Sequence, residues 1–405
     1  MQAGQRSRIA VALGAAAALA AGLAACGPRA EDQPLQLKGG VPVGAVLSLT
    51  SNANAYGQDQ QIGLKLAQAW FQQRRNANSQ KALELNLRLE DGGGDEATAS
   101  QAFNLLIDAG VVALIGPTLS QQAFAADPIA QRRGVPVVAP SNTATGIPQI
   151  GSFISRVSAP STEIAPLSIA KALQLTPSIK RAAVFYAHDD AYSTSETVIF
   201  QKALTDKGLK PVTVQRTQLN DQDFQNQITS ALRESPDLIV ISAQAVDGGN
   251  LIRQLRELGY RGAIVVGNGM NTPNIYPICQ RYCDGILIAQ AYSPELDTPV
   301  NREFVALYQK AKGGAIPPQL TAQAFTAYQV VAEALQRLNK RQPLAQLSLG
   351  EARKALMAEL LGGQYDTPLG EISFTSDGEV VQQRFHVAQV QMQPDGRSGR
   401  FLLLP

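Results

Sequence analysis

Small polar side chains stand where predicted strands of this chain end, and they could bind a small charged molecule. Ser120 follows a Gly-Pro turn at the start of a predicted helix, while Ser141 and Thr143 follow an apolar run. Hydroxyl groups and the free N–H groups of a helix N-terminus suit a carboxylate. The alternative is that Ser120 serves only as a helix N-cap. These residue types favour a binding site over a catalytic one.

Other predicted strands also run into loops with polar or aromatic residues. The first strand leads to Tyr56, and a strand in the second half of the chain leads to Tyr192. Two later strands lead to loops that contain Gln244 and Asn268. In open α/β sheets, ligands bind beyond the carboxyl ends of the strands. These loops are therefore candidates for a site, although each tyrosine could simply pack in a core.

Signals of catalysis or cofactor binding are weak. His188 stands next to Asp189 and Asp190, but no nucleophile motif of the Gly-x-Ser-x-Gly kind accompanies them. The glycine-rich stretches at residues 92–94 and 267–269 lack the spacing of a phosphate-binding or dinucleotide-binding loop. The acids beside the first of them do not fit a calcium loop. We therefore predict no enzyme activity, no catalytic residue, no metal site and no cofactor.

The first 25 residues have the order of a secretory signal, because Arg6 and Arg8 precede an apolar run that ends in Leu23-Ala24-Ala25-Cys26. This ending resembles the lipobox of bacterial lipoproteins, in which the chain is cut before the cysteine and the thiol receives lipid. The alternatives are a plain signal peptide or a membrane helix, but the run is shorter than the roughly 20 residues that a span needs. We expect lipidation at Cys26 and an extracytoplasmic protein anchored to a membrane by lipid.

The rest of the chain has the composition of a soluble protein. Cleavage before Cys26 leaves 405 − 25 = 380 residues, which suits two domains. The signal contains two arginines and no acid, so 33 basic residues then balance 33 acidic ones. No basic block indicates nucleic-acid binding. Residues 26–40 are polar, contain two prolines and show no period, so we predict a tether there and expect a monomer.

Besides Cys26, the expected site of lipidation, the mature chain contains two cysteines, Cys279 and Cys283. An oxidising compartment favours a disulfide between them. A metal site is the alternative, but the two histidines, His188 and His386, lie far away in the sequence.

Strands and helices alternate along most of the chain, which favours mostly parallel sheets covered on both faces. The predicted strands cover residues 41–49, 85–89, 111–115, 135–139, 153–157, 182–186, 211–216, 238–242, 263–267, 285–290, 370–374 and 384–391. The predicted helices cover residues 58–73, 96–109, 121–133, 163–173, 195–207, 224–234, 250–258, 301–311, 321–339 and 351–361. The alternation starts again after residue 157, which predicts two α/β lobes with a cleft between them.

Four stretches, taken in their order and spacing, carry a resemblance to a known family. They are Ala55-Tyr56-Gly57, Ile115-Gly116-Pro117 with Ser120, Val135 to Thr143, and Phe185 to Tyr192. Together they resemble the periplasmic branched-chain amino-acid binding proteins of ABC transporters, over residues 41–391. The resemblance implies the type I periplasmic binding fold, an α/β fold of two doubly wound parallel-sheet lobes joined by a three-segment hinge. We expect lobe 1 to comprise residues 41–158 and 294–364, and lobe 2 to comprise residues 159–293 and 365–405.

The resemblance also implies roles for individual residues. Ser120 and Thr143 would hold a ligand carboxylate, and the backbone carbonyl of Ser141 would accept from its ammonium group. Tyr56 would cover the ligand and Tyr192 would close over it from the second lobe, which suits the apolar face and polar tip of tyrosine. The loops of Gln244 and Asn268 would add further contacts from the second lobe.

One departure from the family concerns the ligand. The family usually places an acid near the end of a late strand of the second lobe, where it pairs with the ammonium group, but this loop is Gly267-Asn268-Gly269-Met270-Asn271. A buried ammonium group without a partner is costly. Either Asp247 or Asp190 substitutes, or the ligand carries an amide or hydroxyl in place of the ammonium group.

The resemblance implies a lipid-tethered solute-binding protein that binds an amino acid or a related small carboxylate or amide and presents it to an ABC permease. One alternative is a ligand sensor that works with a separate membrane receptor. The other is a secreted hydrolase, which would need a catalytic triad that the sequence does not display.

Overall fold

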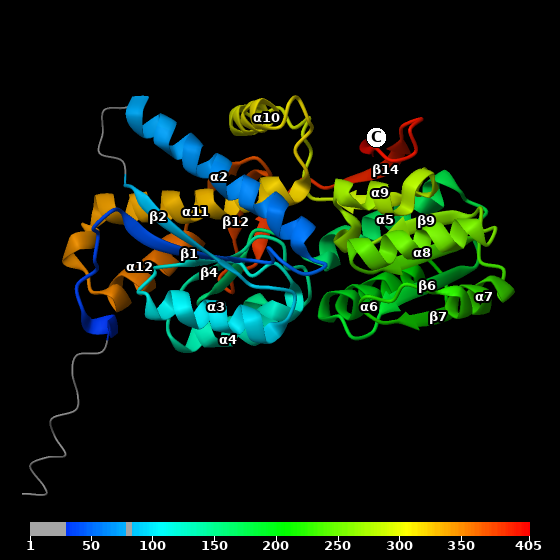
Figure 1. The fold of residues 1–405 in the computed structure, drawn as a ribbon, viewed down its shortest axis with the longest axis horizontal. Helices are drawn as coiled ribbons and strands as arrows, with labels where there is room; N and C mark the ends of the chain where they lie inside the picture. Colours follow the sequence, from blue (N-terminus) through cyan, green and yellow to red (C-terminus); the bar gives the residue numbers. More distant parts are fainter. Residues whose placement is uncertain (1–29, 78–82) are drawn as a thin grey trace, which may run out of the picture.

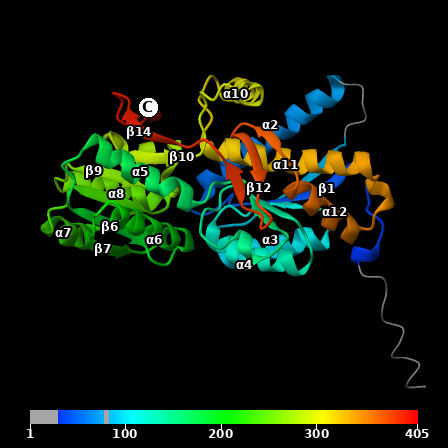
Figure 2. The ribbon, with the colours of Figure 1, turned by 180° about the vertical axis from the view of Figure 1, so that it is seen from behind.

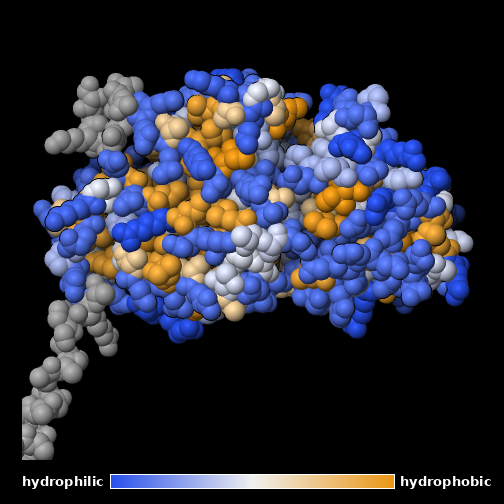
Figure 3. Space-filling view, in the orientation of Figure 1, coloured by the Kyte–Doolittle hydropathy of each residue, from blue (hydrophilic) through white to orange (hydrophobic). Residues whose placement is uncertain are grey.

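Figure 1 shows two α/β lobes side by side along the long axis of a computed structural model, which describes residues 30–77 and 83–405. The predicted signal and Cys26 lie outside the described residues. Among the helices of the described ranges, none is both long and apolar enough to cross a membrane. On the face in Figure 3, the second lobe is mostly hydrophilic and larger apolar areas lie over the first lobe.

The first lobe is built on a parallel sheet in the order β2-β1-β3-β4-β5. Its strands are β1 (Val41–Leu47), β2 (Leu85–Asp91), β3 (Leu114–Ile115), β4 (Val137–Ala139) and β5 (Ile154–Arg156). Its main helices are α2 (Asn54–Ala77), α3 (Glu96–Asp108), α4 (Ser120–Arg132), α10 (Pro299–Ala311), α11 (Gln319–Arg341) and α12 (Leu349–Leu361). Every residue of β1 is buried, because helices cover both faces of the sheet.

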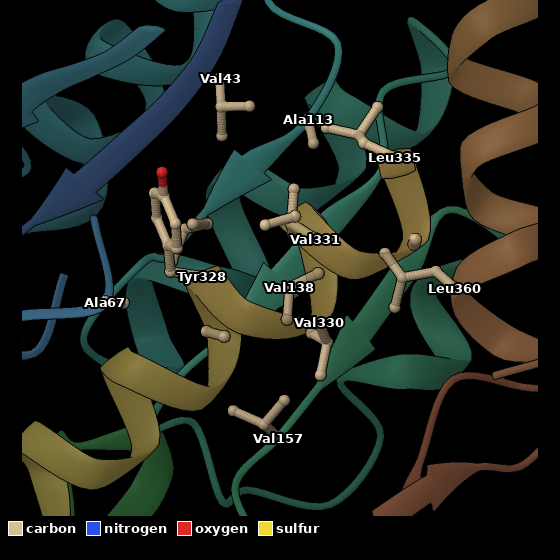
Figure 4. Packing of buried hydrophobic residues seen from close by; sticks show 14 of the residues in the cluster. Val43, Ala67, Ala113, Val138, Val157, Tyr328, Val330, Val331, Leu335 and Leu360 are labelled. Atoms are coloured by element: carbon tan, nitrogen blue, oxygen red, sulfur yellow. The ribbon is translucent and has the colours of Figure 1, made fainter. Parts of the chain in front are cut away.

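Helix α11 fills the centre of the first lobe. Figure 4 shows Tyr328 and Val331 of this helix beside Val43 of β1 and Val138 of β4. Helices α2 and α12 complete this core, while α3 and α4 form a separate core on the opposite face of the sheet. The two cores fix the carboxyl ends of the strands, where the candidate residues lie.

The second lobe is built on a seven-stranded sheet in the order β15-β14-β10-β9-β8-β6-β7, viewed from behind in Figure 2. Its strands are β6 (Ala182–Ala187), β7 (Pro211–Thr217), β8 (Leu238–Ser242), β9 (Ala263–Val266), β10 (Leu287–Gln290), β14 (His386–Met392) and β15 (Gly399–Leu404). Its helices are α5 (Ser161–Leu175), α6 (Ala191–Asp206), α7 (Gln225–Arg233), α8 (Ala245–Glu257) and the short α9 (Tyr276–Cys279). In this sheet β14 pairs antiparallel with both β10 and β15, while the other pairings are parallel.

The C-terminal segment divides differently from the prediction, which assigned all of residues 365–405 to lobe 2. A small antiparallel sheet contains β11 (Tyr365–Thr367), β12 (Gly370–Phe374) and β13 (Val380–Gln382). Buried residues alternate along β12, and Ile372 packs in the core of the first lobe. We therefore keep the lobe division as a proposal, with residues 365–382 moved to lobe 1 and the third hinge segment between β13 and β14.

The predicted tether also differs from the structure after residue 29. The short 3-10 helix η1 (Ala30–Asp32) is followed by Leu35, which is 7% exposed and packs in the first core. The backbone N–H of Leu35 donates to the carbonyl of Leu347 at 3.0 Å. Leu35, with Leu37 packed partly against the same core, thus holds the segment against the lobe.

The other predicted strands and helices match observed elements, with ends shifted by a few residues. Strands β11, β13 and β15 were not predicted. Further 3-10 turns are η2 (Pro148–Ile150), η3 (Asn268–Met270), η4 (Pro273–Ile275), η5 (Gln280–Cys283) and η6 (Leu344–Gln346).

Candidate functional site

A central cavity lies between the two lobes, and the empty space inside it and at its solvent-open mouth totals about 380 Å³. All seven residues that the sequence suggested for ligand binding line it. Its lining consists of Tyr56, Thr118, Leu119, Ser120, Ser141, Thr143, Tyr192, Gln244, Asn268, Gly269 and Leu320. We call it the central cavity. Most of these residues follow the carboxyl ends of parallel strands in the two sheets, which is where ligands bind in such sheets.

The start of helix α4 points toward the central cavity without a side-chain cap. Ser120 is the first helical residue, and Leu119 occupies the N-cap position with no side-chain hydrogen bond. The alternative that Ser120 is the N-cap is therefore wrong, because the N-cap is Leu119, one residue earlier. Because leucine cannot accept from the first turn, the partial positive charge of the helix N-terminus remains for a ligand. The hydroxyl of Ser120 accepts weakly from the backbone of Ala144, at 3.4 Å.

The loop after β4 brings Thr143 to the same end of the cavity. Its side chain is 2% exposed, and its hydroxyl makes no hydrogen bond to another described residue. The guanidinium of Arg156 holds this loop, because it donates to the carbonyls of Asn142 and Ala144 at 3.2 and 2.7 Å. Arg156 also forms a paired contact with the Glu379 carboxylate, at 2.7 and 2.6 Å. The threonine hydroxyl is therefore held in place and remains free to donate.

A buried polar network fixes the neighbouring loops of the first lobe. Gln60 donates to the hydroxyl of Ser141 at 2.7 Å and accepts from the hydroxyl of Thr118 at 2.7 Å. Ser141 in turn donates to the carbonyl of Thr118 at 2.6 Å. The side chain of Ser141 is thus structural, which leaves its backbone carbonyl as the group available to a ligand.

Tyr56 connects the two lobes. It lies in the first turn of α2, where Gly57 allows a close approach, since a Cβ at that glycine would lie 1.9 Å from the carbonyl oxygen of Ser48. The Tyr56 hydroxyl accepts from the backbone N–H of Ala245 at 2.6 Å and donates to the carbonyl of Gly269 at 2.5 Å. Burial raises the pKa of this hydroxyl, so it remains protonated and can donate.

Other contacts also join the lobes. Gln319 at the start of α11 donates to the side-chain oxygen of Asn268 at 3.0 Å. The backbone N–H of Thr145 donates to the hydroxyl of Ser195 at 2.9 Å. The structure therefore represents a closed arrangement, in which both lobes wall the central cavity.

On the second lobe, Tyr192 lies over a buried acid that the sequence analysis missed. The Tyr192 hydroxyl donates to the carboxylate of Glu196 at 2.6 Å and accepts from the backbone N–H of Gly269 at 2.6 Å. Glu196 also accepts from the hydroxyl of Ser242 at 2.7 Å and from the backbone N–H of Asn268 at 3.0 Å. Burial raises the pKa of Glu196, while these donors act in the opposite direction.

The two acids proposed as substitutes, Asp190 and Asp247, line a different space. A side cavity of about 750 Å³ adjoins the central cavity, shares Tyr56, Leu119 and Gln244 with it, and includes both acids. Asp190 caps α6 and accepts from Gln244 at 3.1 Å. Burial raises the pKa of Asp247 to about 6. Neither acid lines the central cavity.

Thr118, Leu119, Gly269 and Leu320 line the central cavity but were not predicted. Thr118 belongs to the same Gly-Pro turn as Ser120, so its position was a usable signal. Leu320 is the second residue of α11, far along the chain, and only packing brings it to the cavity.

The remaining candidates lie away from the cavity. Cys279 and Cys283 are bonded as a disulfide with a Cα–Cα distance of 5.5 Å. No group of metal-binding side chains occurs within residues 30–77 and 83–405. The ring Nδ1 of His188 lies 2.7 Å from the carbonyl oxygen of Thr217, so this histidine binds backbone.

Comparison with known proteins agrees with this architecture. A model of the family described as "Periplasmic binding protein" matches residues 40–397. The Leu/Ile/Val-binding protein BraC3 of Rhizobium johnstonii is 22% identical, with 85% of this chain and 90% of that protein covered. A crystal structure of the leucine-binding protein LivK of Thermotoga maritima is 26% identical and has a TM-score of 0.78, with 89% and 97% of the chains covered.

A further solved structure extends the range of ligands seen on this fold. It is a solute-binding protein of an ABC transporter from Rhodopseudomonas palustris in complex with 3,4-dihydroxybenzoic acid. It is 20% identical, has a TM-score of 0.76, and covers 90% of this chain and 96% of its own.

Proposed function

The chain belongs to the periplasmic binding protein family, which is extracytoplasmic and binds solutes without catalysis, and on that premise we propose a specific role for it. It is the lipid-anchored solute-binding protein of an ABC importer. It binds an amino acid or a related small carboxylate or amide in the central cavity and presents it to the permease. The observation that carries this proposal is the convergence of all seven candidate residues on one cavity between the lobes.

The first lobe supplies a cradle for a carboxylate. The free N-terminus of α4, the hydroxyl of Ser120 and the hydroxyl of Thr143 all lie at one end of the central cavity. No lysine, arginine or histidine is among the described residues that line it. A carboxylate would therefore bind through hydrogen bonds and the helix dipole.

Closure of the two lobes would follow from contacts that the ligand makes with both. The ligand would bind the first lobe through its carboxylate and then contact Tyr192, Gln244 and Asn268 of the second lobe. Only a ligand that interacts differently with the open and closed states shifts their equilibrium. The closed shape, with ligand inside, is the form that the permease would recognise.

The lipid at Cys26 would keep the protein near its permease. A tether converts a search through solution into a local encounter and raises the effective concentration of one partner at the other. The names of the relatives, which bind leucine, isoleucine and valine, support an amino acid, and the dihydroxybenzoate complex supports other carboxylates.

A paired substitution tests the cradle. Ser120→Ala with Thr143→Ala removes both hydroxyl groups and no other hydrogen bond of the described fold beyond the weak contact to Ala144. We expect binding of the carboxylate found in a thermal-shift screen of amino acids, small carboxylates and amides to fall below detection in calorimetry, with the thermal midpoint of the free protein nearly unchanged. The control is Thr205→Ala, which removes a hydroxyl from the exposed end of α6. Unchanged affinity of the double variant would rule out the cradle.

A further inference from the structure

The central cavity has no acid in its wall, yet a buried carboxylate lies directly behind it. Glu196 is 1% exposed and lies one helical turn after Tyr192 on α6. Its position depends on the glycine at 267, because a Cβ there would lie 1.7 Å from the carboxylate oxygen Oε2 of Glu196. The loop of residues 267–271 has no acid of its own, and its glycine leaves the space that Glu196 of the neighbouring helix α6 occupies.

The hydrogen bonds around Glu196 fit the ionised form. Tyr192, Ser242 and the backbone N–H of Asn268 all provide donors to its two oxygens. A carboxylate that accepts several hydrogen bonds is stabilised in its charged state. No ion pair to Glu196 occurs in the part of the chain that the structure describes. Burial raises the pKa of this carboxyl, and the three hydrogen-bond donors are the groups that favour its ionised form.

The bond to Glu196 fixes how Tyr192 faces the cavity. The single hydroxyl proton of Tyr192 is donated to Glu196, and one lone pair accepts from Gly269. The phenolic oxygen therefore presents only an acceptor to the central cavity. Tyr56 is in the same state, because it donates to the carbonyl of Gly269 and accepts from Ala245.

We propose that Glu196 selects ligands that carry a positively charged hydrogen-bond donor, by acting through the hydroxyl of Tyr192. The first-lobe end of the cavity suits a carboxylate, and the second-lobe end combines acceptor oxygens with a buried acid that has no cationic partner among the described residues. Glu196 is a positioning residue, since Tyr192 and not Glu196 lines the cavity. This inference rests on the proposed function, and it assigns the role of the absent loop acid to a residue of α6.

Pairs of probes that differ only in the amino group test this role. The wild-type full chain is titrated with protein amino acids and with the matching carboxylic acids without the amino group, for example L-leucine against 4-methylpentanoate and L-phenylalanine against 3-phenylpropanoate. We expect at least one amino acid to bind about tenfold or more tightly than its partner compound. Glu196→Gln should reduce this ratio to about one, because an amide cannot accept from all three donors and carries no charge.

Two further variants separate this role from a merely structural one. Tyr192→Phe keeps Glu196 with Ser242 and Asn268 but removes the group that transmits its charge, so the ratio should also fall. Glu333→Gln makes the same chemical change at a partly buried glutamate of α11 that accepts from Gln329, and it should leave the ratio unchanged.

The outcomes distinguish this inference from the proposed function. Two results overturn the role of Glu196: a wild-type protein that binds the amino acids and their partner compounds about equally, or a folded Glu196→Gln protein that keeps the wild-type ratio of the two affinities. In either case, binding of the carboxylates still supports the proposed function. If Glu196→Gln does not fold, retention of the ratio by Tyr192→Phe overturns the inference. Absence of binding to every amino acid, carboxylate and amide of the screen overturns both.

Discussion

Replacement of Tyr56 by phenylalanine should shift the protein toward the open state. The hydroxyl makes two hydrogen bonds from the first lobe to the backbone of the second, to Ala245 and Gly269. These bonds exist only when the lobes are closed. In the open state, water can satisfy the same groups.

The size of the effect follows from those two bonds. A typical hydrogen bond contributes about 1 kcal/mol net, and a buried donor left without an acceptor costs about 1–3 kcal/mol. In Tyr56→Phe, the N–H of Ala245 would lose its acceptor in the closed state only. We therefore expect the closed state to lose about 2 kcal/mol, which is roughly a 30-fold change in the ratio of closed to open protein.

The assay measures closure directly. Single-molecule energy transfer between dyes on the two lobes gives the closed fraction without ligand, and calorimetry gives the affinity. Tyr186→Phe is the control, since its hydroxyl accepts from Arg216 within the second lobe, at 3.0 Å. A Tyr56→Phe protein with an unchanged closed fraction and an affinity within about twofold of wild type would refute the reasoning.

Three other substitutions test different parts of the structure. Arg156→Met leaves Glu379 unpaired and the carbonyl of Ala144 without a donor, while the carbonyl of Asn142 keeps the hydroxyl of Ser158. We therefore expect a loss of about 3–5 kcal/mol in urea unfolding and weaker ligand binding, whereas removal of the exposed ion pair of Arg302 should cost about 1 kcal/mol or less. A loss for Arg156→Met as small as that for Arg302 would contradict the role of Arg156 in holding the loop. Burial raises the pKa of Asp247 to about 6 in the folded protein, whereas in the unfolded chain its pKa is near the ordinary value of 3.8. Between these two pH values the folded protein keeps a proton on Asp247 that the unfolded chain has released. Wild-type stability should therefore fall relative to Asp247→Asn as the pH rises from about 4 to about 6, by roughly 2–3 kcal/mol, and stay lower above that range; parallel pH profiles would argue against it. Cys26→Ala should release the protein from membranes into the soluble fraction, and continued labelling by a fatty-acid analogue would exclude this cysteine as the lipid site.

The cavity could be anticipated because its residues follow the ends of strands. Alternation of strand and helix predicts parallel sheets, and the carboxyl ends of parallel strands lie at one edge. Ser120, Thr143 and Tyr192 each follow such an end, so a local pattern was enough to bring them to one cleft. The roles implied for them by the family resemblance remain proposals.

The sequence did not reveal the roles of residues whose local pattern is typical of a different environment. A glutamate in a helix that begins with polar residues indicates a solvated face, yet Glu196 is buried because the glycine at 267 leaves room for it. Residues 365–382 form three short antiparallel strands, and their local alternation of residue types does not say which lobe they will contact. Leu35 lies in a mostly polar segment, and no period marks its burial.

The sequence by itself determined the class of the protein, because hydrophobic periodicity, turn residues and the strand-end loops are all local features. Only the tertiary structure decided where the charges of the cleft lie. It placed Glu196 behind Tyr192, kept Asp190 and Asp247 in the side cavity, and joined Tyr56 to the opposite lobe. Burial and hydrogen-bond partners depend on residues distant in the chain, so the electrostatics of the site emerge only when the lobes are packed.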